Sequence, residues 1–457
     1  EGIQALRAAG SRAQALTLSN NASAGFIKAL GEQARGVVVS QVLPGERSMG
    51  VPMITVSVVA SIMYKNLGLT NSEIALYTGA MYLPWVIKPL WSPLVDLYGT
   101  KRKWFLAMQL VLSFAFLCIG LSVPTDQFFV LTLAFFWLAS FASATNDIAS
   151  DGFYLLALKE EQQSFFIGLR STFYRVAMVT GQGLFVIVAG YLEVKYGDNA
   201  KAWSLTMVMV AGLMFILTLI NLWTTPNIEK SSAYVKEVQL TFVKVFSSFF
   251  KKKEIGAALA FILFYRLGES QLVKMASPFL LDSRPDGGLG LSTTDVGLIY
   301  GTFGIIALSL GGIIGGVVIS KDGLGKWMLP MILALNVPNF FYYLLAYFQP
   351  ESAFWAGFVV VVEQLGYGFG FAAFMMYLIY VSEGPSKTSH YAIATGFMAL
   401  GMMLPGMASG FVQEWLGYEG FFLWVVAAAV PGILMIRYVK FPKEYGKKKV
   451  EEIQNEK

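Results

Sequence analysis

The chain has 457 residues, of which 56% are hydrophobic and only 14% are charged. Soluble domains carry about 25% charged residues, so the composition excludes a soluble globular protein and indicates an integral membrane protein with many spans. The net charge of +5 is modest and the basic residues gather at the ends of apolar segments, so we expect no nucleic-acid partner. Cys118 is the single cysteine and His390 the single histidine, which leaves no intrachain disulfide, and we expect no metal and no cofactor.

Residues 1–48 differ from the rest of the chain in being polar. Short patterns typical of alternating helix and strand fill 1–44. The stretch LTLSNNASAGFIKALGEQARGVVVSQVLP resembles a piece of the periplasmic amino-acid-binding proteins that serve ABC importers, but without a complete ligand site, so it implies no binding activity. An ordinary polar extension is the alternative. We expect a fused or replaced start that leaves the first membrane helix truncated or altered, and no signal peptide, because no apolar segment follows a basic start.

Apolar segments of membrane-spanning length follow from residue 49 onward, each near the ~20 residues that cross ~30 Å of hydrocarbon. We predict helices over 49–66, 74–95, 103–123, 127–158, 164–193, 202–223, 255–281, 293–319, 326–348, 352–381, 390–416 and 420–440. The lysine-bearing stretch 225–254 is predicted to be a cytoplasmic linker between bundles over 49–224 and 255–441, and a basic cytoplasmic tail covers 442–457.

The second predicted helix belongs to a stretch that recurs half a chain later. Gly68–Trp104 begins GLTNSEIALYTGA and ends KRKW, and Gly290–Trp327, about 222 residues downstream, begins GLSTTDVGLIYGT and ends GKW. In the first copy Thr70 and Glu73 form the T-x-x-E pattern of a helix N-terminus. A direct repeat at half-chain spacing is typical of transporters built from two parallel halves. The sequence therefore predicts an all-α membrane protein with the major facilitator fold, with about twelve transmembrane helices in two six-helix bundles.

Charge asymmetry predicts the orientation of this core. Most lysines and arginines lie in every second loop and in the tail, while the opposite loops hold few, namely Lys65, Lys195, Lys201 and Arg284. By the positive-inside rule both ends of the core face the cytoplasm. The basic link after the second helix is predicted to hold a gating and anchoring cluster of Asp96, Lys101, Arg102 and Lys103.

Ionisable side chains inside the predicted helices carry the functional signal, because an unpaired charge in hydrocarbon costs several kcal/mol. The proton-coupling candidates are Asp147, Asp151, Glu269 and Glu363. The substrate-binding candidates are the cations Lys88, Arg170, Arg175 and Arg266, which suit carboxylates, and the aromatic residues Tyr174, Tyr265 and Tyr367, which suit sugar rings. Prolines around Lys88 predict a bent second helix.

Several candidates have a structural alternative. Ion pairs between Lys88 and a helix-4 aspartate, between Asp151 and Arg170, or between Arg266 and Glu269 would neutralise charge without a role in transport. Glu363 has no partner on its own helix, which favours a proton-binding role. The glycine runs GGIIGG at 311–316 and GYGFG at 366–370 predict close helix packing rather than phosphate loops.

Four stretches carry a family resemblance: LPWVIKPLWSPLVD (83–96), ATNDIASDGFYLLAL (144–158), GLRSTFYRVAMVTGQG (168–183) and KTSHYAIATGFMALGMMLPGMASG (387–410). They resemble the AmpG-type muropeptide permeases, which belong to the major facilitator superfamily, and the resemblance covers about 50–441. It implies proton-coupled import of N-acetylglucosaminyl-anhydro-N-acetylmuramyl peptides across the bacterial inner membrane. It places Asp147 and Asp151 on the D-I-x-x-D pattern of the family and Lys88 on its K-x-L-W-x-P pattern.

The sequence therefore predicts a monomeric secondary active transporter in the lipid bilayer, with protons and an amphiphilic sugar-peptide as its partners. An enzyme is not expected, because the chain has no nucleophile elbow, metal-ligand set or nucleotide motif. One alternative is a symporter for another oligosaccharide, a peptide or an acyl-CoA. A ligand-binding or sensing membrane protein is a further alternative, but 1–44 is too short for a two-lobed binding domain.

Overall fold

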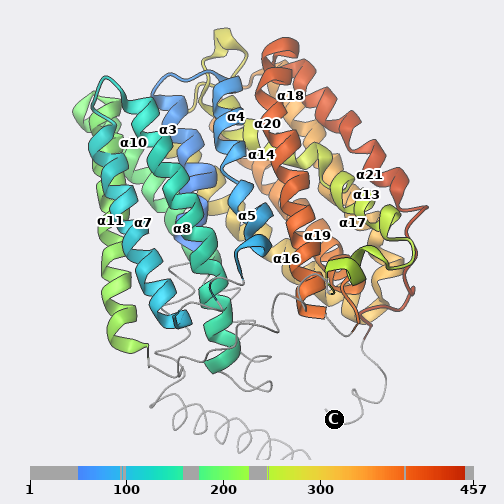
Figure 1. Cartoon of the computed structure of the whole chain (residues 1–457). Coiled ribbons are helices and arrows are strands. Elements are labelled where there is room, and N and C mark those ends of the chain that lie inside the picture. The colour runs from blue at the N-terminus through green and yellow to red at the C-terminus, as the bar shows by residue number, and fades with distance from the viewer. Residues whose placement is uncertain are drawn as a thin grey trace, which may run out of the picture.

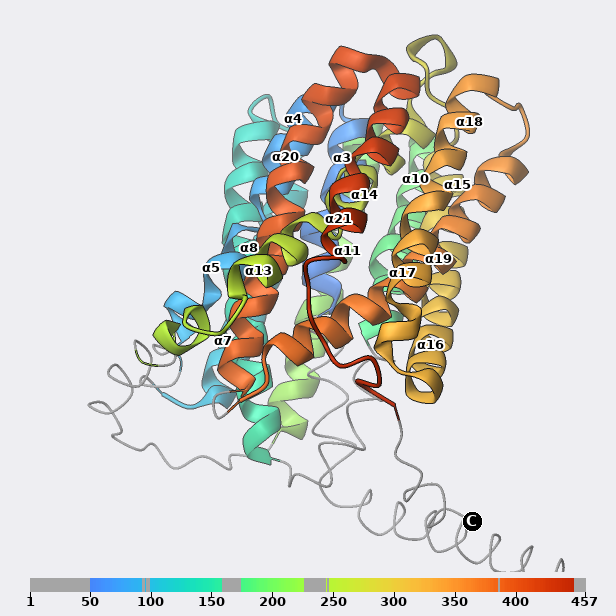
Figure 2. The ribbon, with the colours of Figure 1, turned by 90° about the vertical axis from the view of Figure 1, so that its right-hand side faces the viewer.

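The computed structural model describes residues 50–92, 95, 99–157, 174–225, 244, 246–384 and 387–447 (Figure 1). Within these residues the regular secondary structure is helical, without a strand. The helices run side by side between two ends of the molecule, as the two views in Figures 1 and 2 show. We call the end at the top of Figure 1, where α3 (Ala60–Asn66) joins α4 (Asn71–Ala80), the upper end.

The N-terminal half of the chain forms the first group of helices. Besides α3 and α4 these are the π-helical η1 (Thr55–Val59), α5 (Leu83–Ile87), the 3₁₀ turn η2 (Lys88–Leu90), α7 (Lys101–Ser122), α8 (Phe128–Ala157), the π-helical η3 (Val179–Phe185), α10 (Val186–Tyr196) and α11 (Asn199–Thr224). The second pass, 71–90, is broken into α4, α5 and η2, with prolines at 84 and 89, which confirms the predicted bend.

The C-terminal half forms the second group. It holds α13 (Ile255–Phe264), α14 (Leu267–Leu281), η4 (Arg284–Asp286), α15 (Thr293–Leu298), the π-helical η5 (Ile299–Gly304), α16 (Ile305–Asp322), α17 (Leu324–Asn336), η6 (Val337–Asn339), α18 (Phe340–Phe348), α19 (Ala353–Val381), α20 (Lys387–Ala428) and α21 (Val430–Met435). The helix α20 turns at Gly417, whose φ of 66° lies in the left-handed region that glycine tolerates.

Eight helical segments of the described chain are long and apolar enough to cross a membrane. One of them, His390–Met435, turns back at Gly417 and therefore passes twice. The remaining passes, 50–66, 71–90 and 255–281, are shorter or interrupted, so none of them is a continuous apolar helix of membrane-spanning length. Counted this way, the described chain makes the twelve passes that the sequence predicts.

The repeated stretches begin two helices in the same way. Thr70 and Glu73 form a reciprocal capping box at the start of α4, which confirms the prediction for this terminus. Ser292 and Asp295 form the same capping box at the start of α15. The repeated sequence therefore forms the same helix N-terminus, a capping box, at the beginning of both copies.

Glycines allow the two halves to meet at the level of their backbones near the upper end. A Cβ added to Gly410 of α20 would collide with the backbone carbonyl of Asn71 at the start of α4. A Cβ added to Gly190 of α10 would stand 2.5 Å from the backbone nitrogen of Thr294 in α15. Small residues at such crossings are the usual means of close packing between membrane helices. Together the two crossings bring the second pass against the eleventh and the fifth against the eighth.

The glycine runs of the C-terminal half serve the same purpose within that half. A Cβ on Gly311 of α16 would meet the carbonyl of Leu365, and a Cβ on Gly368 of α19 would meet the carbonyl of Leu308. The two helices are therefore in backbone contact, which confirms the packing role predicted for these glycines.

Candidate transport site

The C-terminal half contains a group of buried and half-buried polar side chains, which we call the C-half cluster. Its members are Arg266, Glu269, Tyr342, Glu363, Gln364 and Tyr367. Arg266 stands where α13 gives way to α14, and Glu269 lies in the first turn of α14. Glu363 and Tyr367 lie one turn apart on α19 and so on one face of it. Both glutamate side chains are 0% exposed, so the cluster brings two carboxyl groups predicted from the sequence into the interior.

Arg266 is directed more towards Tyr367 than towards Glu269. Its Nη2 donates a hydrogen bond to the Tyr367 hydroxyl at 2.5 Å and lies 3.9 Å from Oε1 of Glu269. Its guanidinium carbon is 4.9 Å from the centroid of the Tyr367 ring. Within the described chain, neither carboxylate oxygen of Glu269 has a hydrogen-bond partner. The predicted Arg266–Glu269 pair is therefore present only as a long contact that leaves the carboxyl group poorly satisfied.

Glu363 is held by neutral donors. Gln364 donates its side-chain amide to Oε2 of Glu363 at 3.0 Å, and the Tyr342 hydroxyl donates to the same oxygen at 3.5 Å. No ion pair joins Glu363 to a cation among the residues that the structure describes. In the described chain the buried Glu363 carboxyl group is thus contacted by neutral groups alone.

The N-terminal half places the helix-4 acids on α8. Asp147 is half-buried, and its Oδ2 accepts a hydrogen bond at 3.0 Å from the indole nitrogen of Trp85 in α5. Asp151 lies one turn further along and is also half-buried. Lys88, in η2, is half-buried, and no ion pair joins it to either aspartate within the described residues. The alternative in which Lys88 only neutralises these acids is thus not seen.

The helix-5 candidates Tyr174 and Arg175 precede η3. The Tyr174 hydroxyl contacts the sulfur of Met53 at 3.4 Å. Arg175 is half-buried, and a Cβ on Gly312 of α16 would stand 3.2 Å from its Nη2, so the guanidinium reaches the opposite half. Its Nη1 is buried without a hydrogen-bond partner among the described residues. Arg175 is therefore a cation with unused donors between the two halves.

Tyr265 has a different surrounding from the other aromatic candidates. It is 0% exposed, its ring stacks on Phe374 with 4.6 Å between centroids and 10° between planes, and its hydroxyl donates to the carbonyl of Gly370 at 2.8 Å. These contacts place it in the core of the C-terminal half, where its ring offers no free face to a sugar.

Of the predicted gating cluster, Lys101, Arg102 and Lys103 are described, whereas Asp96 and the substrate candidate Arg170 lie outside the described residues. Lys101 is buried and Lys103 is exposed. Arg102 donates to the carbonyl oxygens of Thr225 at 2.7 Å and Leu222 at 2.8 Å. Its guanidinium therefore binds the last carbonyl groups of α11, which is an anchoring role.

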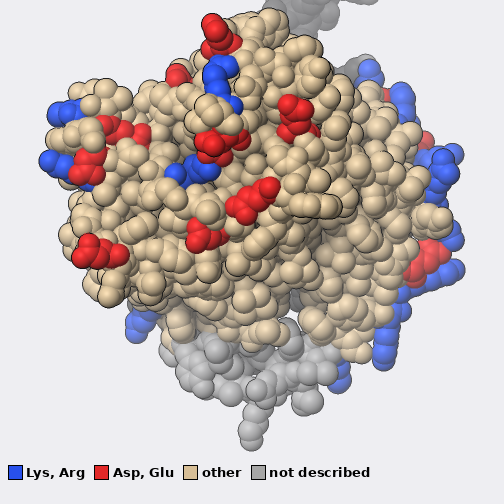
Figure 3. All heavy atoms as spheres, turned by 90° about the horizontal axis from the view of Figure 1, so that it is seen from above, with Lys and Arg blue, Asp and Glu red and all other residues tan. Residues whose placement is uncertain are grey.

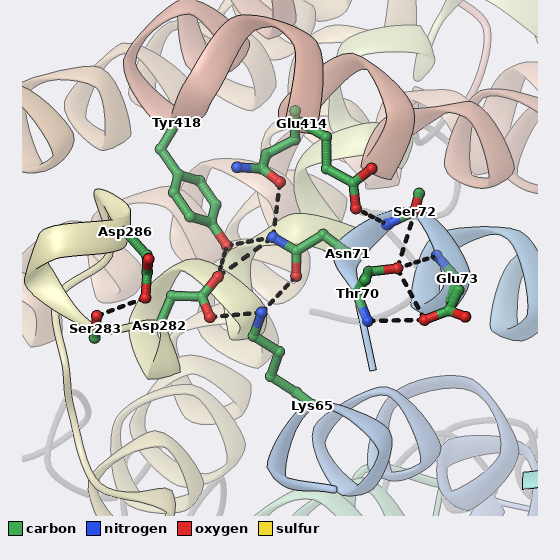
Figure 4. A network of polar contacts seen from close by, with 11 residues as sticks. Lys65, Thr70, Asn71, Ser72, Glu73, Asp282, Ser283, Asp286, Glu414 and Tyr418 are labelled. Carbon is green, nitrogen blue, oxygen red and sulfur yellow. Dashed lines mark hydrogen bonds and ion pairs between the residues drawn. The ribbon is translucent and has the colours of Figure 1, made fainter. Parts of the chain in front are cut away.

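The upper end holds a set of polar contacts between the halves that the sequence analysis does not single out. We call it the inter-half network; it comprises Lys65 and Asn71 from the N-terminal half, and Asp282, Gln413 and Tyr418 from the C-terminal half. Figure 4 shows how Lys65, Asn71 and Tyr418 gather around Asp282. Lys65 Nζ lies 2.5 Å from Oδ1 of Asp282, and the Tyr418 hydroxyl donates to Oδ2 of the same carboxylate at 2.5 Å. The face of the upper end carries acidic and basic side chains close together (Figure 3).

Asn71 joins the parts of this network. Its side-chain amide donates to Gln413 at 2.7 Å and to the Tyr418 hydroxyl at 2.8 Å, while its side-chain carbonyl accepts from Lys65 at 2.8 Å. A second contact between the halves lies nearby, where Asn66 donates to the Thr293 hydroxyl at 2.7 Å. These contacts join the two halves at the upper end, along the helix pairs that the glycines bring together.

The comparison with known proteins agrees with this architecture. The sequence profile of the Major Facilitator Superfamily matches residues 48–387. The chain belongs to the Major Facilitator Superfamily. It is 26% identical over 367 residues to the anhydromuropeptide permease of Escherichia coli (strain K12), which covers 79% of this chain and 71% of that protein. It is 24% identical over 407 residues to a putative transporter AmpG 4 of Rickettsia conorii, covering 85% of this chain and 93% of that one.

Solved structures of this superfamily share the fold. The nucleoside transporter NupG has a TM-score of 0.66 and 16% identity, covering 88% of this chain and 98% of its own, and a D-xylose-proton symporter has a TM-score of 0.66 and 12% identity over 89% and 98%. The protein is thus a multi-pass membrane transporter of a small molecule. The predicted major facilitator fold and the AmpG-type resemblance are confirmed, and relatives and fold are those of transporters rather than enzymes.

Proposed function

We propose that this transporter is a proton-coupled importer of muropeptides, the N-acetylglucosaminyl-anhydro-N-acetylmuramyl peptides, in the bacterial inner membrane. Similarity to the anhydromuropeptide permease over 79% of this chain supports the choice of substrate. The observation that carries the coupling is the state of Glu269, which is 0% exposed, has no hydrogen-bond partner in the described chain and has its cation 3.9 Å away.

Proton coupling follows from the cost of burying such a charge. An uncompensated carboxylate in a membrane interior costs several kcal/mol, and a proton on Glu269 removes most of that cost. Glu363 is the second proton-binding candidate, since only neutral groups contact it in the described chain. When a change of conformation brings water to either group, that group ionises without this penalty, so proton binding and the change of conformation are linked.

The inter-half network fits alternating access between a bundle over 49–224 and a bundle over 255–441. With both ends of the core in the cytoplasm, the upper end faces the periplasm, and Lys65, Asn71 and Asp282 close the path there. Import then requires that this network breaks to admit the solute and forms again before release on the other side. The direction of transport follows the proton gradient.

Uptake into proteoliposomes tests the proposal. We expect radiolabelled N-acetylglucosaminyl-anhydro-N-acetylmuramyl tripeptide to accumulate when the outside is acidic and to stop accumulating when a protonophore is added. Glu269→Gln should abolish accumulation but retain exchange of labelled for unlabelled solute. Glu254→Gln is the matched control, because Glu254 is an acid at the molecular surface that pairs with Lys440. Proton-driven uptake that persists after Asp147, Asp151, Glu269 and Glu363 are all changed to amides contradicts the coupling.

Competition separates the substrate alternatives. Unlabelled muropeptide should compete fully with the label, and the free disaccharide or the free peptide only weakly. Stronger competition by a plain oligosaccharide, a peptide or an acyl-CoA would assign the protein to that other solute.

A further inference from the structure

Lys274 of α14 is a buried cation that faces the opposite half of the molecule. It is 6% exposed, and its ammonium group donates to the Thr78 hydroxyl of α4 at 3.0 Å and to the carbonyl of Ser57 in η1 at 3.4 Å. It also lies 5.2 Å from the centroid of the Tyr82 ring. These partners belong to the N-terminal half, while Gly406 of α20 packs beside the aliphatic part of the lysine. The side chain therefore crosses the plane between the halves.

Among the residues that the structure describes, no carboxylate pairs with this ammonium group. The ion pairs of the described chain do not include Lys274, and its contacts are a hydroxyl, a carbonyl and an aromatic ring. An ammonium group inside a membrane protein is costly unless it is paired or meets water or ligand. A link between two helices needs no charge, because a neutral donor such as glutamine bonds a hydroxyl equally well. A basic amine at this position therefore calls for a function beyond that of a link between helices.

The position of Lys274 relative to the inter-half network suggests when its charge becomes available. Thr78 lies seven residues after Asn71 on α4, which is about two turns or ~10 Å further into the molecule. When the halves part at the upper end, the inter-half network breaks, and Thr78 and Ser57 move away with the N-terminal half. Lys274 stays on α14 with its ammonium group facing the opened space.

We infer that Lys274 binds a carboxylate of the transported solute when the upper end opens. When the upper end is closed, Thr78 and Ser57 accept the hydrogen bonds of Lys274 in place of the carboxylate. The inference rests on the proposed function and adds a residue that selects solutes bearing a carboxylate over their uncharged analogues. It also makes the solute a competitor of an inter-half contact, so that binding favours the open upper end.

The test compares Lys274→Met with Thr78→Val in proteoliposomes. The first variant keeps the length of the side chain but removes its charge, and the second removes the hydroxyl partner and keeps the charge. The two probes are the labelled muropeptide tripeptide and the same compound with its peptide carboxylates converted to carboxamides. We expect the wild type to prefer the acid about tenfold or more in kcat/KM. Lys274→Met should lose this preference but still take up the amide, which shows that it is folded, and Thr78→Val should keep the preference.

Two results overturn the inference. One is an unchanged preference for the acid in Lys274→Met, and the other is an equal loss in Lys274→Met and Thr78→Val, which would mean that the lysine only links the helices. If the wild type takes up neither probe, the proposed substrate is wrong. The role of Lys274 is then decided by a thermal-shift assay, in which each sugar acid or peptide is compared with its own amide. Stabilisation by acids alone that disappears in Lys274→Met and not in Thr78→Val supports it, and the absence of any such stabilisation in the wild type refutes it.

Discussion

Removal of the charge on Lys65 tests whether the inter-half network holds the upper end closed. The ion pair with Asp282 is 2.5 Å long, and its side chains are 14% and 16% exposed. It thus lies between exposed pairs, which contribute about 0–1 kcal/mol, and buried pairs, whose breakage costs about 3–5 kcal/mol. We expect Lys65→Met to destabilise the closed upper end by about 2 kcal/mol, which lowers the ratio of closed to open molecules about 30-fold.

Distances between the halves report this change directly. In a Cys118→Ser background, cysteines replacing Asp126 and Glu351 place spin labels on exposed loops at the upper end, one in each half. Double electron–electron resonance in lipid nanodiscs then gives the distribution of distances between the labels. The Lys65→Met distribution should gain a longer component that is minor in the parent protein.

Matched variants separate the ion pair from a general effect of charge. Lys195 is a cation at the same end, and its ammonium group contacts the ring of its neighbour Tyr196. Lys195→Met should therefore leave the distances between the spin labels unchanged. Exchange of the two partners, Lys65→Asp with Asp282→Lys, should restore the shorter distance. A monodisperse Lys65→Met protein with the parent distribution would refute the role assigned to this network.

Three further outcomes follow from the structure. Gly410→Val should prevent closure, because its side chain would collide with the carbonyl of Asn71, and the spin-label distances should be long even at low temperature. Tyr418→Phe removes a hydroxyl from the inter-half network and should shift the same equilibrium less than the lysine change, by about 1 kcal/mol or fivefold. Lys440 lowers the pKa of the exposed Glu254, so Glu254→Gln should reduce Tm slightly at neutral pH, and the difference should vanish as the pH falls through the folded-state pKa of Glu254. Scanning fluorimetry at two pH values measures it.

The sequence predicts those parts of the fold that depend on local pattern. The helix cap at Thr70 and Glu73 follows from residue types at fixed spacing, and the structure forms it twice because the stretch is repeated. Glycine runs predict backbone contact between α16 and α19 for the same reason, since only their small size permits it. Long apolar segments also predict the passes, including 49–66, 74–95 and 255–281, which the structure forms as shorter or interrupted helices.

The sequence does not predict which charges meet across the halves. Lys65 and Asp282 stand more than 200 residues apart at the ends of their helices, where each looks like an ordinary loop charge. Lys274 attracts little notice beside Arg266 and Glu269, because its burial depends on the approach of α4 and η1 from the other half. Residue spacing within one helix does not predict these contacts between the halves, because they arise from tertiary packing alone.

The helix α14 connects these observations, since it carries charged groups at three depths. Glu269 lies in its first turn, Lys274 about 7.5 Å further along, and Asp282 caps its upper end about 12 Å beyond that. A solute shifts the conformational equilibrium only by the difference in its affinity for the two states. Opening the upper end costs the Asp282 contacts and the hydrogen bonds of Lys274, and a carboxylate on Lys274 offsets part of that cost. A neutral solute offers no such compensation, and a transporter built in this way therefore opens preferentially for an anion.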